Sequence, residues 1–93
     1  MLASLYLNNN DRNARSAEVK HGLHEMRAGE GGVIALLFGE DAMSRRLADL
    51  GFTEGASVNC LYKSPSGDPA AYLVRGTVIA LRREDAARVE VRL

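Results

Sequence analysis

The most constraining feature of this chain is a short helical pattern that ends on a glycine and is followed by closely spaced strand patterns. Asp41 can accept hydrogen bonds from the free amides of a first helical turn. Apolar residues then recur at helical spacing, and Gly51 follows where a left-handed glycine commonly ends a helix. Strand patterns with very short spacers fill the rest of the chain. This order predicts one helix, over about residues 41–50, inserted into a small β domain.

Five strand patterns accompany the predicted helix. Some alternate apolar and polar residues, and the first is a continuous apolar run that is short enough for a strand buried on both faces. They cover residues 33–38, 57–63, 71–75, 77–81 and 88–93. Residues 83–86 have the composition of a single helical turn. We therefore predict a mainly β fold, a small barrel of about five short strands, because closure removes exposed sheet edges.

The composition changes close to residue 23. Residues 8–22 contain few apolar side chains, so they cannot bury enough surface to offset the entropy lost on ordering. We expect residues 1–22 to be a flexible N-terminal extension and residues 23–93 to be the folded domain. With 93 residues in total, the chain has room for one small domain.

Charge and composition disfavour several classes of partner. The chain has 12 basic and 12 acidic residues, so its formal net charge is zero, whereas proteins that bind nucleic acid usually carry a basic excess. No apolar run approaches the ~20 residues of a membrane helix, and no secretion signal is apparent. The single cysteine, Cys60, fits a reducing compartment. These patterns predict a cytoplasmic protein with no nucleic acid partner and no direct membrane insertion.

Four short segments of the chain form a pattern when taken together. They are Leu47-x-x-Leu50-Gly51-Phe52-x-x-Gly55, Gly67-Asp68-Pro69, Val74-Arg75-Gly76 and Ile79-Ala80-Leu81-Arg82-x-x-Asp85-Ala86. In order and spacing these segments resemble FeoA, the family of small accessory proteins of bacterial ferrous iron transport, although each segment alone would be weak. The resemblance covers roughly residues 23–93, and the N-terminal extension departs from it.

The resemblance implies an SH3-like β-barrel that acts without catalysis. It also implies a partner, the FeoB-type membrane GTPase that carries Fe2+ inward, and recruitment to the inner face of the membrane. An alternative stays open, because the same barrel forms the C-terminal domain of some iron-dependent repressors. That alternative is a stand-alone, metal-responsive regulatory barrel. A homo-oligomer is also left open, and the sequence implies no certain cofactor.

One group of residues has the chemistry of metal ligands. His21, His24 and Glu25 carry imidazole and carboxylate groups, which suit Fe2+ or Zn2+. The two histidines would share a face of a helix, but Gly22 between them weakens that helix. We therefore regard a solvated terminus as the stronger interpretation, with transient binding of a divalent metal as the alternative.

Catalytic chemistry finds no support in the sequence. Cys60 lies in the middle of a strand pattern, with no base or electropositive setting beside it, so a buried and inert thiol is expected. The serines close to Gly67 are explained by a turn, and no histidine accompanies them. No constellation indicates an enzyme.

Partner recognition is the remaining interpretation, and exposed polar residues are its candidates. Arginines of the C-terminal third interleave with acidic residues, which is typical of a solvated face with local ion pairs. They could also meet an acidic surface of a partner. Adding the polar side of the predicted helix and the tip of the hairpin loop gives the candidate contact residues Arg45, Arg46, Asp49, Gly67, Asp68, Pro69, Arg75 and Arg82.

Overall fold

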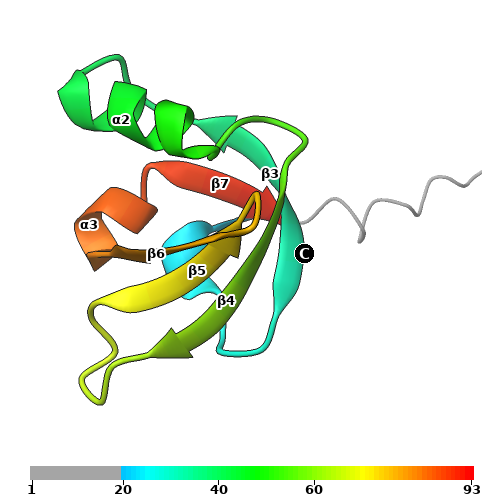
Figure 1. The fold of residues 1–93 in the computed structure, drawn as a ribbon, viewed down its shortest axis with the longest axis vertical. Helices are drawn as coiled ribbons and strands as arrows, with labels where there is room; N and C mark the ends of the chain where they lie inside the picture. Colours follow the sequence, from blue (N-terminus) through cyan, green and yellow to red (C-terminus); the bar gives the residue numbers. More distant parts are fainter. Residues whose placement is uncertain (1–19) are drawn as a thin grey trace, which may run out of the picture.

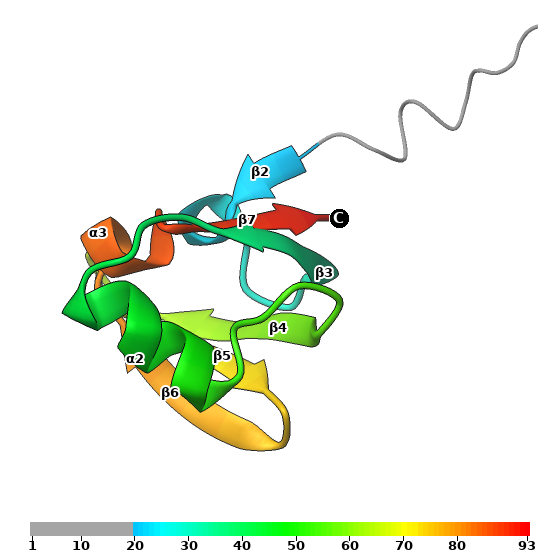
Figure 2. The same ribbon diagram turned by 90° about the horizontal axis from the view of Figure 1, so that it is seen from above.

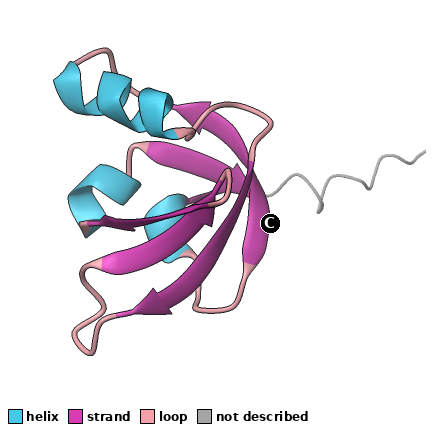
Figure 3. Ribbon diagram, viewed as in Figure 1, coloured by secondary structure: helices cyan, strands magenta, loops and turns pink. Residues whose placement is uncertain are grey.

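Six antiparallel strands curl around one apolar core in the computed structural model, which describes residues 20–93 (Figure 1). The strands are β2 (Lys20–Gly22), β3 (Gly31–Leu37), β4 (Ser57–Lys63), β5 (Ala70–Val74), β6 (Thr77–Leu81) and β7 (Val89–Arg92). Three helices accompany them, namely the 3-10 helix η1 (Leu23–Glu25), α2 (Ala42–Leu50) and α3 (Arg83–Ala86). Figure 3 shows that strands dominate this part of the chain. The predicted mainly β fold with one inserted helix and a late helical turn is confirmed.

The sheet has two ends, which the predicted closed barrel would not have. Its strand order is β2-β7-β3-β4-β5-β6, and within residues 20–93 no pairing joins β6 to β2. The expectation of closure is therefore wrong in this detail. Strand β2 has three residues and pairs only with β7, whereas β6 lies beside α2 (Figure 2). At the β6 end, α2 lies across a groove from the strand, and no further strand of residues 20–93 pairs with β6.

The edge strand β2 was not expected from the sequence. Lys20 pairs with Arg92, His21 with Val91 and Gly22 with Glu90. The sheet therefore begins before Leu23, where we expected the folded domain to start. The predicted flexible extension over residues 1–22 otherwise lies outside the described residues, so the division of the chain into two segments stays a prediction.

Two register shifts bend the sheet around the core. One lies between Ile34 and Leu36 in β3, and the other between Cys60 and Tyr62 in β4. Bulges of this kind increase local twist and allow a small sheet to curl. Leu36 remains 45% exposed, so the prediction that residues 33–38 are buried on both faces is wrong. The antiparallel sheet leaves one side of β3 partly in water.

Aliphatic side chains fill most of the core, as expected for a chain without Trp. Helix η1 closes one end of the core, where Leu23 is fully buried and its carbonyl accepts a hydrogen bond from the Tyr72 hydroxyl at 3.4 Å. The Lys63 ammonium group donates to the carbonyl of His24 at 3.1 Å. The largest buried side chains belong to Leu23, Met26, Ile34, Leu47, Phe52, Val58, Tyr72, Val74, Val89 and Val91.

Candidate interaction groove

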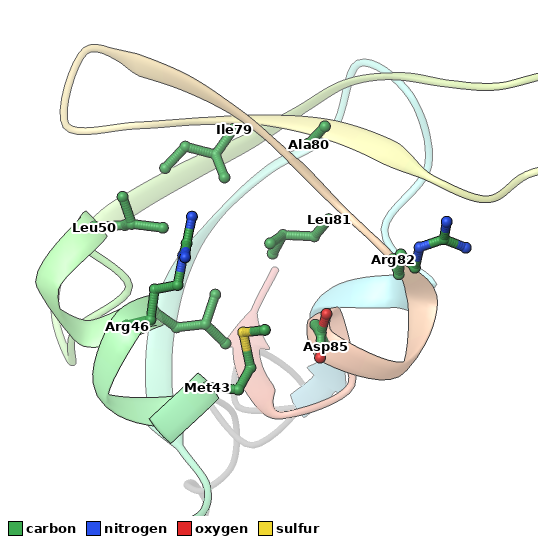
Figure 4. Close-up of a pocket in the computed structure, with 9 residues that line it drawn as sticks. Met43, Arg46, Leu50, Ile79, Ala80, Leu81, Arg82 and Asp85 are labelled. Carbon is green, nitrogen blue, oxygen red and sulfur yellow. The ribbon is translucent and has the colours of Figure 1, made fainter. Parts of the chain in front are cut away.

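A groove of about 240 Å³ lies between α2 and the outermost strand β6 (Figure 4). Its walls are mainly aliphatic, and charged side chains stand at its rim. Met43, Arg46, Leu47 and Leu50 come from α2, Ile79, Ala80, Leu81 and Arg82 from β6 and its end, and Asp85 from α3. Figure 4 shows Met43 and Leu50 on the helix side and Ile79 and Leu81 on the strand side.

The N-terminus of α2 is fixed by a network centred on Arg88. The Asp41 carboxylate caps the helix, accepting from the Ser44 amide at 3.1 Å. Arg88 Nη1 donates to the same carboxylate oxygen at 2.7 Å and to Ser44 Oγ at 3.1 Å. Ser44 Oγ in turn donates to the Phe38 carbonyl at 2.7 Å. The helix that forms one wall of the groove is therefore tied to the start of β7 and the end of β3.

The same network changes the acidity of the capping residue. The pKa of Asp41 lies below its ordinary value because the Ser44 amide, and then the Arg88 guanidinium, stabilise the carboxylate. Arg88 Nε also lies 3.7 Å from an Asp85 carboxylate oxygen. Asp85, the one acidic residue that lines the groove, is thus already engaged by a cation.

The C-terminus of α2 ends on the predicted glycine. Gly51 has φ 113°, a left-handed conformation, and its amide donates to the Ala48 carbonyl at 3.0 Å. Phe52, fully buried, donates its amide to the Leu47 carbonyl at 3.0 Å. The stem of Arg75 packs over Gly51, since a Cβ built on this glycine would lie 3.0 Å from Arg75 Cγ. Both ends of the helix are therefore anchored.

The candidate contact residues from the sequence divide into two groups. Arg46 and Arg82 both border the groove, one on each wall. Arg45 and Asp49 are exposed on α2 but do not line the groove, and Arg75 lies in the β5–β6 turn, where Nη2 donates to Thr53 Oγ1 at 3.2 Å. The structure thus places two arginines that are far apart in the sequence on the border of one groove.

The loop residues Gly67, Asp68 and Pro69 lie between β4 and β5, away from the groove lining. Asp68 Oδ1 accepts from the Arg83 amide at 2.9 Å and so caps the first turn of α3. This structural role was not predicted from the sequence. As a contact region, the loop stays a prediction.

The metal-ligand candidates occupy β2 and η1 and do not share the helix that the sequence suggested. Glu25 Oε1 accepts from the Gly22 amide at 2.8 Å and lies 3.8 Å from His21 Nδ1. The His24 ring packs on Gly22 and occupies the space that a Cβ on this residue would need. Within residues 20–93, no three His, Cys, Asp or Glu side chains meet as a metal site would require. Metal binding by His21, His24 and Glu25 stays a prediction.

The buried thiol expected at Cys60 is confirmed. The side chain is 1% exposed, and burial raises the pKa of the thiol, which disfavours the reactive thiolate. Burial also raises the pKa of Tyr72, its cross-strand neighbour, to about 12. Both side chains belong to the core.

The strand wall of the groove was missed in the sequence, apart from Arg82. Ile79 and Ala80 belonged to a strand pattern and to a family motif but were not contact candidates, because the position of a strand at the end of a sheet depends on strand order. Arg88 was counted among solvated arginines. Its spacing of three from Asp85 was a local signal, but its contact with Asp41, 47 residues away, had none.

Comparisons with known proteins agree with this architecture. The family model described as FeoA domain matches residues 21–93. A curated relative from Porphyromonas gingivalis, an Fe(2+) transport protein A/Fe(2+) transporter FeoB fusion protein, is 34% identical over 71 residues. That match covers 76% of this chain but 8% of the fusion protein.

Solved structures show the same fold. FeoA from Chlorobium tepidum is 33% identical, with a TM-score of 0.73, and the match covers 78% of this chain and 70% of that one. FeoA from Stenotrophomonas maltophilia, an SH3-domain protein solved with zinc, is 36% identical, with a TM-score of 0.67 and coverages of 74% and 86%. A manganese-dependent transcriptional repressor is 19% identical, with a TM-score of 0.70, and the match covers 78% of this chain and 41% of that one; it shares the fold alone.

Among residues 20–93, no helix has the length and apolar character needed to cross a membrane. The predicted SH3-like fold is confirmed by the solved relatives, and the family model spans most of the chain. This chain belongs to the FeoA domain family.

Proposed function

We propose that this protein is a non-enzymatic accessory protein of bacterial ferrous iron uptake, and that it docks on the cytoplasmic part of a FeoB-type membrane GTPase transporter. The main support for the proposal is the Porphyromonas gingivalis fusion protein, in which an Fe(2+) transport protein A and the transporter FeoB form one polypeptide. Covalent linkage gives two modules a high effective concentration, which favours their association. A FeoA chain encoded separately would need a binding surface to reach the same arrangement.

The groove between α2 and β6 supplies a surface of the right chemical kind. It combines aliphatic walls with two arginines on a rigid scaffold, and its helix is anchored at both ends. Non-obligate protein interfaces are commonly built in this way, with an apolar centre and a polar rim. In this proposal the protein acts in the cytoplasm and is recruited to the inner membrane face by its partner. For the Stenotrophomonas maltophilia relative, a role as a ferrous iron transport activating factor has been suggested.

Biolayer interferometry tests the proposal directly. The full chain is immobilised, and a purified FeoB-type cytoplasmic domain from the same genome is titrated without nucleotide, with GDP and with a non-hydrolysable GTP analogue. We expect saturable binding in at least one nucleotide state. Absence of binding in all three states, with both proteins folded, would contradict the proposal.

The repressor-like alternative predicts a different outcome. A stand-alone regulatory barrel would respond to Fe2+, Mn2+ or Zn2+, or would bind a DNA-binding chain. Its support is the shared fold of the manganese-dependent repressor, which at 19% identity carries no functional argument. A metal-dependent change in thermal stability, together with no binding to the transporter domain, would favour this alternative.

A further inference from the structure

The outer edge of β6 has unpaired backbone groups that face the groove. The β5–β6 hairpin turns through Arg75 and Gly76, both with positive φ (49° and 77°), as in a two-residue hairpin turn. Val74 and Thr77 flank this turn and form its first cross-strand pair. In such a hairpin, alternate residues of β6 direct their amide and carbonyl groups to β5.

This alternation identifies the residues whose backbone points away from the sheet. Thr77, Ile79 and Leu81 are directed to β5, and Val78 and Ala80 are directed outward. β6 is the last strand of the sheet, and no residue within 20–93 makes a backbone hydrogen bond with Val78 or Ala80 across this outer edge. A free edge of this kind is a template for one further strand.

The groove runs along this edge and not merely across one face of β6. Four consecutive residues, Ile79 to Arg82, line it, although Ile79 and Ala80 direct their side chains to opposite faces of the sheet. Because Ala80 belongs to the lining although its side chain points away from that of Ile79, the groove reaches the backbone of β6 at this position. The opposite wall is α2, whose partly buried Met43 and Leu50 leave apolar surface beside the edge (Figure 4).

The charges around the edge specify the composition of a partner segment. Arg46 and Arg82 are exposed, and neither forms an ion pair with a carboxylate among residues 20–93. Asp85, the acidic group of the lining, is engaged by Arg88. A segment that fits would place an apolar side chain against Ile79 and the helix, and carboxylates beside the two arginines.

We propose that β6 accepts an extended, acidic and apolar segment of the partner as an additional strand, with alternate side chains entering the groove. Adding a strand to a free edge obtains affinity from backbone hydrogen bonds and specificity from pockets for alternate side chains. The identification of that segment as part of a FeoB-type transporter rests on the proposed function. A second copy of this chain fits poorly, because antiparallel pairing of two β6 strands would bring Arg75 of one copy towards Arg82 of the other.

Two variants separate the backbone contribution from the charges. Ala80→Pro removes an outward amide while leaving the hydrogen bonds to β5, since proline is tolerated where the amide of an edge strand faces solvent. Arg46→Glu combined with Arg82→Glu reverses both rim charges. The matched controls are Ala28→Pro and Arg27→Glu in the η1–β3 turn, outside the groove; Ala28 precedes Gly29, with φ 94°, where a turn accepts proline.

Each full-length variant is checked for folding by its thermal midpoint and its 15N–1H correlation spectrum. Binding is then measured to the FeoB-type cytoplasmic domain and to a short fluorescein-labelled peptide in which Leu and Val alternate with Glu and Asp. We expect Ala80→Pro to weaken both affinities about tenfold, because it removes one backbone hydrogen bond to the added strand and keeps that strand from approaching closely. The double reversal should weaken both by more than tenfold, and the controls should bind within twofold of the wild type.

The transporter domain and the labelled peptide test the proposed function and strand addition separately. If the transporter domain binds and all variants bind it equally, the strand-addition surface is wrong and the proposed function stands. If the transporter domain does not bind, the proposed function fails, and the peptide decides the inference. Peptide binding that is insensitive to Ala80→Pro, or equal affinity for a peptide with Lys in place of its acidic residues, would overturn the inference.

Discussion

Truncation of Leu47 tests how strongly its buried apolar side chain holds α2 on the domain. Leu47 is 0% exposed and belongs to the core, whereas Met43 and Leu50 on the same helix are only partly buried. Leu47→Ala removes buried methyl groups and leaves a cavity, a change that costs about 2.7–5 kcal/mol in comparable cores. We expect about 3 kcal/mol, near the lower limit, because the neighbouring groove gives the helix room to shift inward.

The free energy of unfolding is measured by urea denaturation and the midpoint by calorimetry. For a domain of 60–100 residues, 3 kcal/mol corresponds to a fall in the melting midpoint of roughly 12–24 °C. The control is Leu61→Ala, because Leu61 is 39% exposed and should cost less than about 1 kcal/mol. If Leu47→Ala cost no more than the control, the packing argument for α2 would be refuted.

Four further predictions concern the capping residues and the buried titratable groups. Gly51→Ala should destabilise the protein by about 1–2 kcal/mol, because φ 113° strains an L residue, whereas Glu54→Ala in the next turn should change the urea midpoint little. Because the pKa of Asp41 is lower in the folded protein, the ionised carboxylate adds to the free energy of unfolding above the unfolded pKa of 3.8. This contribution is lost as the pH falls through the lower, folded pKa. The difference in unfolding free energy between wild type and Asp41→Asn should therefore shrink on acidification, and a constant difference would argue against the network around Arg88. The pKa of Tyr72 is about 12 in the folded protein and 10 in the unfolded chain. The free energy of unfolding should therefore fall between pH 10 and pH 12, by up to about 1.4 kcal/mol per pH unit. Tyr72→Phe should remove this pH dependence. Cys60 should react with a thiol reagent only on unfolding, so rapid labelling of the native protein would contradict its burial.

Local signals predicted the helix and its ends well. Asp41 and Gly51 specify caps through their own backbone and side chain, so α2 could be placed to within a residue of its observed bounds. The hairpin through Gly76 and the turn at residues 83–86 were likewise encoded by neighbouring residues. Composition and periodicity alone predicted a small barrel without distinguishing between barrel types. The family resemblance identified the barrel as SH3-like.

Non-local contacts account for what the sequence did not reveal. Strand β2 joins the sheet through its backbone, so its polar side chains carried no pattern. The open edge of β6 follows from strand order, which no residue in β6 encodes by itself. Arg46 was assigned to the exposed face of the helix, yet it borders a groove because β6 passes beside it. The proposed interaction surface therefore became visible only when distant elements were placed together.

Docking of the groove between α2 and β6 on the transporter can be observed directly by titrating the 15N-labelled protein with the FeoB-type cytoplasmic domain and recording 15N–1H correlation spectra in each nucleotide state. We expect the largest shifts and line broadening to fall on α2 and β6, centred on Ala80 and Arg46, and to saturate as binding is completed. Shifts confined to β3 and β7, or spectra that do not change at any concentration of the domain, would contradict this docking.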